Sequence, residues 1–181
     1  SLDAFTIPMF SDYDQDGALD LVLGGAHDMP TTLYKNWSKA MKNEKLPLNN
    51  ASENVDILEI DLNNDGLLDL YFVNGSNEKP EGSPDLMDEI LVNKNGKFSK
   101  ITNPTNIAHN KSCAIKLDYD QDGYDDIVVG GGVRPQAYPT SYPSRLLRNN
   151  KGVLEEVPNE ALNSLNQYGI IMDMPAIDYN N

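Results

Sequence analysis

The sequence has a single cysteine among its 181 residues and few basic side chains. Cys113 has no second cysteine to pair with, so an intramolecular disulfide is excluded, and its apolar neighbours predict a buried strand residue. The 14 Lys and Arg residues stand against 28 Asp and Glu residues, a formal net charge of −14. Because nucleic acids and anionic membrane surfaces attract clustered positive charge, we expect neither as a partner.

Long apolar runs and common catalytic motifs are also missing. No segment approaches the ~20 consecutive apolar residues that span a bilayer, so we expect no membrane insertion. The chain contains no Gly-x-Ser-x-Gly, no His-Glu-x-x-His and no phosphate-binding loop. Its two histidines, His27 and His109, are interpreted as ordinary loop residues. The sequence therefore favours a non-catalytic protein over an enzyme.

A nine-residue acidic pattern recurs along the chain. Its three complete copies read DYDQDGALD at 12–20, DLNNDGLLD at 61–69 and DYDQDGYDD at 118–126, with starts 49 and 57 residues apart. A fourth copy begins at Asp178. Each complete copy follows a short, largely apolar stretch and runs into an apolar segment that ends in glycine, so the pattern is interpreted as the turn of a β-hairpin.

Two further strand-like segments follow the hairpin in each repeat. The third strands are predicted at 33–36, 89–93 and 145–149, and Asn/Gly turns at 95–96 and 150–152 lead into fourth strands in the second and third repeats. In the first repeat, a polar, helical insertion is expected around 38–50, and another short helix at 158–168.

Four short strands in each repeat of ~50–60 residues are typical of a propeller blade. We therefore expect an all-β fold of four-stranded antiparallel β-propeller blades. Residues 1–181 would form a partial propeller with repeats at about 1–50, 51–110 and 111–169 and the start of a fourth at 170–181. Since closed propellers have about 4–8 blades, about three blades would be part of a larger ring.

The acidic pattern has the chemistry of a calcium site. Carboxylates a few ångströms apart repel one another, so a sequence that repeatedly gathers them indicates a cation. Oxygen ligands without His or Cys favour a hard cation, and a flexible cage of several carboxylates suits Ca²⁺ better than Mg²⁺. In each loop we expect side-chain ligands at positions 1, 3, 5 and 9, a backbone carbonyl ligand at position 7, and a glycine at position 6 for the sharp reversal.

Three Ca²⁺ sites are predicted in this way. The first consists of Asp12, Asp14, Asp16, the Ala18 carbonyl and Asp20; the second of Asp61, Asn63, Asp65, the Leu67 carbonyl and Asp69; the third of Asp118, Asp120, Asp122, the Tyr124 carbonyl and Asp126. Three bound ions would add six positive charges and change the formal charge from −14 to −8. The acidity then serves metal binding and says little about partners.

Two other calcium-loop types do not match the pattern. An EF-hand or dockerin-like loop needs a carboxylate at position 12, where this chain has Leu23, Phe72 and Val129. The glycine-rich nonapeptide of parallel β-helices has different spacings.

The pattern D-x-[DN]-x-D-G-x-x-D, followed by an apolar strand and glycine, resembles the FG-GAP or VCBS repeats of integrin-α-like β-propellers. The run from Ser144 to Gly152 is similar to blades of ASPIC/UnbV-type members. The resemblance covers nearly the whole chain and implies a β-propeller with Ca²⁺ in these loops and partners on the opposite face or edge. The chain departs from the pattern in having no clear Phe-Gly pair before each loop, and only Gly24-Gly25-Ala26 approaches the Gly-Ala-Pro element.

The variable loops between second and third strands lie at 26–32, 76–88 and 133–144. The last carries Arg134, Tyr138 and Tyr142 among prolines and has no acid, which suits contact with a protein or glycan. An ordered connector that packs on its own blade is the alternative for this loop.

Two functions are considered for the whole chain. The first is a calcium-binding, non-catalytic module for adhesion or recognition, extracellular or at the cell surface, because loops of this kind load where calcium is millimolar. The alternative is a polysaccharide-active lyase or hydrolase on a calcium-stabilised propeller.

Overall fold

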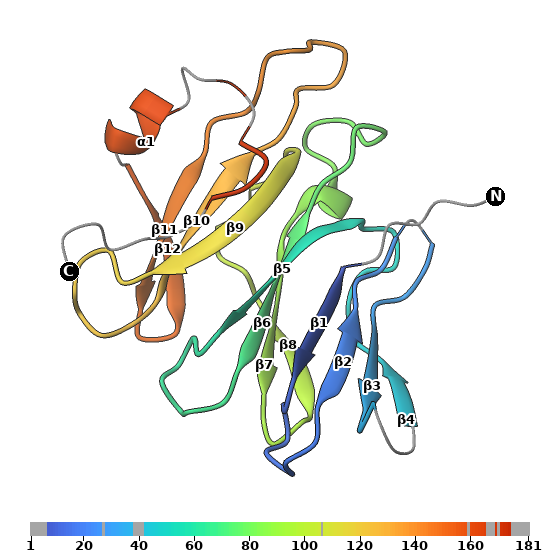
Figure 1. Cartoon of the computed structure of the whole chain (residues 1–181). Helices are drawn as coiled ribbons and strands as arrows, with labels where there is room; N and C mark the ends of the chain where they lie inside the picture. Colours follow the sequence, from blue (N-terminus) through green and yellow to red (C-terminus); the bar gives the residue numbers. More distant parts are fainter. Residues whose placement is uncertain are drawn as a thin grey trace.

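The structure, a computed structural model, describes residues 7–26, 28–37, 42–105, 107–158, 160–165, 169 and 171–174. These residues form three four-stranded antiparallel sheets and almost no helix, as expected for β-propeller blades (Figure 1). Most of the 170–181 segment, including Asp178, lies outside the described residues, as does His27.

Each sheet is a meander in which consecutive strands pair. The first blade contains β1 (Pro8–Ser11), β2 (Asp20–Leu23), β3 (Thr32–Lys35) and β4 (Lys42–Lys45). The second contains β5 (Asn54–Ile60), β6 (Asp69–Asn74), β7 (Glu89–Asn93) and β8 (Phe98–Ile101), with a 3₁₀ helix η1 at Pro84–Leu86. The third contains β9 (Lys111–Leu117), β10 (Asp126–Gly131), β11 (Arg145–Asn150) and β12 (Val153–Val157), and the helix α1 (Glu160–Leu165) follows it.

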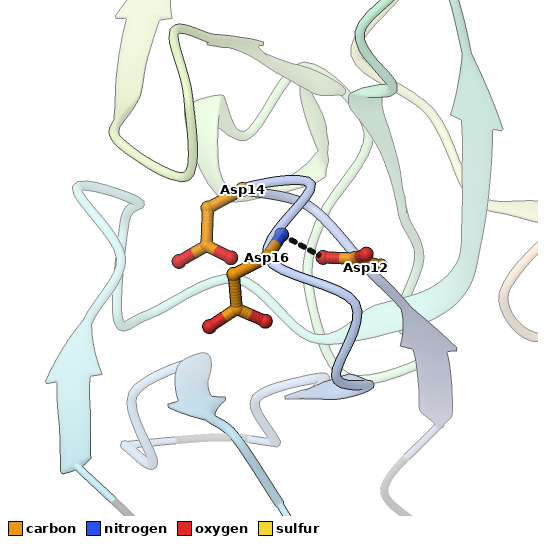
Figure 2. Close-up of side chains that lie close together, drawn as sticks. All are labelled: Asp12, Asp14 and Asp16. Atoms are coloured by element: carbon orange, nitrogen blue, oxygen red, sulfur yellow. Dashed lines mark hydrogen bonds between the residues drawn. The ribbon is translucent and has the colours of Figure 1, made fainter.

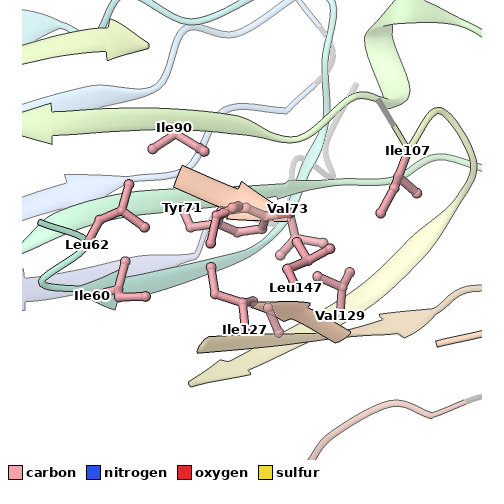
Figure 3. Close-up of a cluster of buried hydrophobic side chains, with 11 residues drawn as sticks. Ile60, Leu62, Tyr71, Val73, Ile90, Ile107, Ile127, Val129 and Leu147 are labelled. Atoms are coloured by element: carbon pink, nitrogen blue, oxygen red, sulfur yellow. The ribbon is translucent and has the colours of Figure 1, made fainter. Parts of the chain in front are cut away.

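Much of the core lies on β6, because both of its faces are covered by neighbouring blades. In β6, Leu70 and Phe72 pack toward the first blade, whereas Tyr71 and Val73 pack toward the third. This alternation follows from the two-residue period of a strand. Figure 3 shows Tyr71 and Val73 beside Ile127 and Val129 of β10. The apolar run of β6 therefore holds the three blades together.

The polar stretch after β3 was expected to be a helical insertion, and that prediction is wrong: β4 pairs with β3 and completes the first blade. All four of its residues, Lys-Asn-Glu-Lys, are exposed. A strand with no buried face has no apolar alternation, and charged side chains are common on sheet edges. The helix expected over 158–168 is present as α1, and Cys113 is buried in β9 as predicted.

The three acidic patterns connect β1 to β2, β5 to β6, and β9 to β10. In Figure 1 these turns lie along the lower left of the molecule, and the connections between second and third strands lie along the upper right. The fold thus gathers the acidic loops at one end of the blades and the variable loops at the other.

Candidate metal centre

The three acidic loops share one backbone framework. In each, the carboxylate at position 1 accepts the backbone N–H groups of positions 5 and 6. The distances are 3.0 and 2.8 Å for Asp12, 3.0 and 2.8 Å for Asp61, and 3.1 and 3.0 Å for Asp118. The carboxylate at position 5 in turn accepts the N–H of position 7, at 2.9 Å in every loop. Near-identical sequences therefore fold into near-identical loops.

Two residues of each loop have left-handed backbone conformations. At position 4, Gln15, Asn64 and Gln121 have φ of 57°, 55° and 60°. At position 6, Gly17, Gly66 and Gly123 have φ of 83–88°. Glycine adopts this conformation without the steric penalty that a Cβ would bring. The recurring glycine is thus explained by the reversal that turns positions 1, 3 and 5 toward a common centre.

The first loop brings three carboxylates together. One oxygen each of Asp12, Asp14 and Asp16 lies within 4.8 Å of the other two (Figure 2). Oδ2 of Asp14 lies 3.7 Å from Nζ of Lys35, but its Oδ1 is buried without a hydrogen-bond partner among the described residues. A buried carboxylate oxygen without a partner is unfavourable. Because this orphaned oxygen belongs to a carboxylate grouped with two others, the group fits a hard cation.

The third loop gathers a different set of three. Here Asp118, Asp120 and the closing Asp126 have oxygens within 4.8 Å of one another. No such group of three acids is found in the described second loop, where Asn63 stands at position 3 and donates a 3.1 Å hydrogen bond to Asp65. Asp16 belongs to the compact group of its loop, whereas its counterpart Asp122 does not.

The residues at position 7, Ala18, Leu67 and Tyr124, are placed by the N–H bonds to position 5. Their carbonyl contribution to a metal site stays a prediction, as do the complete ligand sets of all three loops.

The closing aspartates have a second role that sequence reasoning missed. Asp20, Asp69 and Asp126 are fully buried, and each accepts one backbone N–H from position 2 of its loop and one from the asparagine at the end of the third strand. Those asparagines are Asn36, Asn93 and Asn149. Their recurrence in every repeat, 16 to 24 residues after the closing aspartate, is the signal that could have revealed the contact.

Burial determines the ionisation of these aspartates. Desolvation raises the pKa of Asp20, Asp69 and Asp126 above the ordinary value, although the two N–H donors oppose it. For Asp69 the pKa rises to about 6. The carboxylates at the loop bases are thus costly to charge until a cation lies near them.

The loop proposed for partner contact packs partly against the second repeat. Tyr142 is only 5% exposed, and its ring stacks on His109 with centroids 4.4 Å apart. The guanidinium of the exposed Arg134 lies 4.7 Å from the centre of the Tyr142 ring, while Tyr138 is 80% exposed. Tyr142 is therefore a packing residue of the ordered connector, and Arg134 and Tyr138 are the two of the three that face solvent.

A buried ion pair at the same end of the second blade was also missed. Nζ of Lys111 lies 3.1 Å from Oδ1 of Asp88, and both side chains are 1% exposed. Tyr71 donates a 2.6 Å hydrogen bond to the same carboxylate, and the Asn74 N–H a 2.8 Å one. Burial raises the pKa of Asp88 and lowers that of Lys111. Thr31 and Ser144 occupy the place of Asp88 in the other blades, so no repeat pattern reveals this pair.

A cavity of about 560 Å³ opens beside this pair. It is lined by Asn49, Glu89, Lys100 and Asn103 together with the apolar side chains of Met87 and Ile107. Lys100 and Glu89 form an ion pair on its wall. The cavity lies at the end of the second blade that carries the variable loops.

Within the described residues, no helix is long and apolar enough to cross a membrane.

Comparison with known proteins bears on the acidic loops and the blades that carry them. A comparison with curated proteins gives no match. The FG-GAP-like repeat family matches residues 12–72 and again residues 61–129, which together include all three acidic loops. Three blades, three equivalent loops and these two matches lead to one conclusion: the chain belongs to the FG-GAP-like repeat family.

Proposed function

We propose that the chain is a calcium-binding, non-catalytic repeat module of an extracellular or cell-surface protein, which serves adhesion or recognition of a protein or glycan. The observation that carries the proposal is the orphaned oxygen of Asp14, whose carboxylate is grouped with those of Asp12 and Asp16 in a loop framework that two other loops repeat.

The residues at positions 1, 3, 5 and 9 of each loop would hold the ion. Bound Ca²⁺ supplies positive charge to carboxylates that otherwise repel one another, and it links the two strands that the loop connects. The protein's own part is to hold the loop backbone in place through the carboxylate at position 1 and the buried carboxylate at position 9. The expected role of the ion is therefore structural.

An exported location follows from the affinity expected for such loops. Calcium loops of extracellular modules have dissociation constants of about 10⁻⁴–10⁻³ M, and we expect the same of these exposed loops. They would fill at millimolar calcium and stay largely empty in the cytosol.

Recognition is assigned to the end of the blades opposite the acidic loops. Tyr138 there is 80% exposed, and the exposed Arg134 lies on the same loop. The cavity between Asn49 and Asn103 opens at this end too. The enzyme alternative gains no support from His109, because this histidine is buried against Tyr142.

Isothermal titration calorimetry with CaCl₂, and with MgCl₂ for comparison, tests the proposal. We expect three calcium ions per chain and far weaker magnesium binding. Asp120→Ala should remove one site, whereas Asp125→Ala removes the same charge next to the loop's closing residue and should leave three. No heat with calcium, or equal stoichiometry for the parent and Asp120→Ala, would contradict the proposal.

A further inference from the structure

The loops of neighbouring blades are joined by the same buried hydrogen bond at both blade junctions. At the end of β7, the side-chain amide of Asn93 donates to the Tyr13 carbonyl of the first loop at 2.8 Å. At the end of β11, the amide of Asn149 donates to the Leu62 carbonyl of the second loop at 2.9 Å. Tyr13 and Leu62 both occupy position 2, and all four residues are at most 1% exposed. The first and second loops are thus each held by the next blade.

The same asparagines also hold the loop of their own blade. The backbone N–H of Asn93 donates to Oδ1 of Asp69, and that of Asn149 donates to Oδ1 of Asp126, both at 2.7 Å. Oδ2 of Asp69 accepts the N–H of Leu62 at 3.1 Å. A continuous buried path of hydrogen bonds therefore connects the loops, in the order Tyr13, Asn93, Asp69, Leu62, Asn149 and Asp126.

An exposed link runs parallel to this buried path. Nε2 of Gln15 donates to the Gly66 carbonyl at 3.2 Å, and Nδ2 of Asn64 donates to the Gly123 carbonyl at 2.9 Å. Both donors stand at position 4 of one loop, and both acceptors at position 6 of the next. Gln121 occupies position 4 of the third loop, and among the described residues its amide has no hydrogen-bond partner. Gln121 therefore serves as a control for Gln15 and Asn64, because its side chain makes no such link among the described residues.

We propose that the three loops bind calcium as a coupled set. The positioning residues are Asn93 and Asn149 on the buried path and Gln15 and Asn64 on the exposed link, through which binding at one loop reduces the conformational freedom of the next. This inference rests on the proposed calcium function and adds cooperativity to it. An ion held by positions 1, 3 and 5 fixes the peptide groups of position 2, which lie between those ligands. Since position 2 is bonded to the next blade's asparagine, and that asparagine to the next closing aspartate, the second loop loses less freedom when it binds its own ion.

A double-mutant cycle on the first junction tests the coupling. Asp14→Ala should disable the first site while sparing the loop backbone, because Asp14 accepts no backbone hydrogen bond among the described residues. In ¹⁵N-labelled protein, the shift of the Gly66 amide reports calcium binding to the second loop. In the parent background, we expect Asp14→Ala to weaken calcium binding at the second loop by at least ~5-fold, the lower end of typical coupling. In the Asn93→Ala background, Asp14→Ala should weaken calcium binding at the second loop by less than about 2-fold.

Gln15→Ala provides a second variant that changes only an exposed side chain, should Asn93→Ala fail to fold. It should reduce the coupling factor, whereas Gln121→Ala should leave it unchanged; an equal effect of the two would overturn the inference. If the calcium titration of the Gly66 amide shift has the same midpoint in the parent and in Asp14→Ala, the coupling is wrong, but the proposed calcium binding is not contradicted. A Gly66 amide that does not respond to calcium in the parent would overturn the proposed function as well.

Discussion

The side-chain amide of Asn149 in the third blade donates a 2.9 Å hydrogen bond to the backbone carbonyl of Leu62 in the acidic loop of the second. Both residues are buried. The contact shows that the acidic loops are not free surface turns: each is part of the junction between two blades. Metal binding at a loop and stability of the blade stack are therefore expected to depend on each other.

The closing aspartate should matter even without calcium. Both oxygens of Asp126 accept backbone N–H groups, those of Tyr119 and Asn149, each at 2.7 Å. Asp126→Asn places an amide N–H₂ against one of these donors, so we expect a loss of about 1–3 kcal/mol in the free energy of unfolding. Urea unfolding in chelator measures it.

Asp120→Ala is the matched comparison for this variant, because Asp120 is a predicted ligand that lacks those backbone bonds. In chelator it should lose less than about 0.5 kcal/mol, as is usual for a surface substitution. Equal losses for Asp126→Asn and Asp120→Ala would show that the structural role assigned to Asp126 is wrong.

The buried ion pair should be sensitive to removal of one partner. Lys111→Met leaves the Asp88 carboxylate buried without its cation, and we expect a loss of about 3–5 kcal/mol in the free energy of unfolding. Adding Asp88→Asn should recover part of that loss, since the uncompensated charge is then gone. Lys116→Met is the control, because the Lys116 side chain is 42% exposed and its ion-pair partner among the described residues, Asp125, is also partly exposed. A chemical denaturation series in which Lys111→Met and Lys116→Met unfold alike would contradict the assignment.

The pH dependence of stability should contain a contribution from His109. Burial lowers the pKa of His109 to about 4, below its ordinary 6.5. The unfolded chain therefore binds a proton in the range between these values and the folded chain does not, so stability from this group is full above pH 6.5 and is lost as the pH falls toward 4. The loss should reach about 3 kcal/mol at pH 4.

His109→Phe keeps a ring against Tyr142 and cannot titrate, so the difference between the two unfolding profiles isolates the histidine. This comparison is needed because Asp69, whose pKa is raised to about 6, acts with the opposite sign over the same range. Parallel profiles for the parent and His109→Phe from pH 7 to pH 4 would refute the prediction.

The repeat signals in the sequence were sufficient to predict the blades and the loop positions. Gly17, Gly66 and Gly123 recur because the turn requires positive φ, and the apolar run of β6 recurs in β2 and β10 because these strands are also largely buried. Requirements that act within one repeat, such as positive φ in a turn or burial of a strand, can be predicted from the spacing of residue types.

Features that depend on contacts between blades could not be predicted in the same way. The second role of Asp69 requires a donor from Asn93, 24 residues away, and Asn93 requires an acceptor at Tyr13, 80 residues away. The strand β4 was missed because none of its side chains is buried. Tyr142 was expected to contact a partner because the sequence does not reveal its packing on His109.

The most direct test of the account is thermal unfolding of the chain in calcium and in chelator. With calcium at about 20 times its dissociation constant, each site adds about 2 kcal/mol by mass action. Three sites should therefore raise the midpoint by at least about 10 °C over that in EDTA, given the usual shift of about 2–4 °C per kcal/mol at this chain length. Magnesium at the same concentration should have little effect. Superimposable melting curves in calcium and in EDTA would contradict calcium binding by these loops.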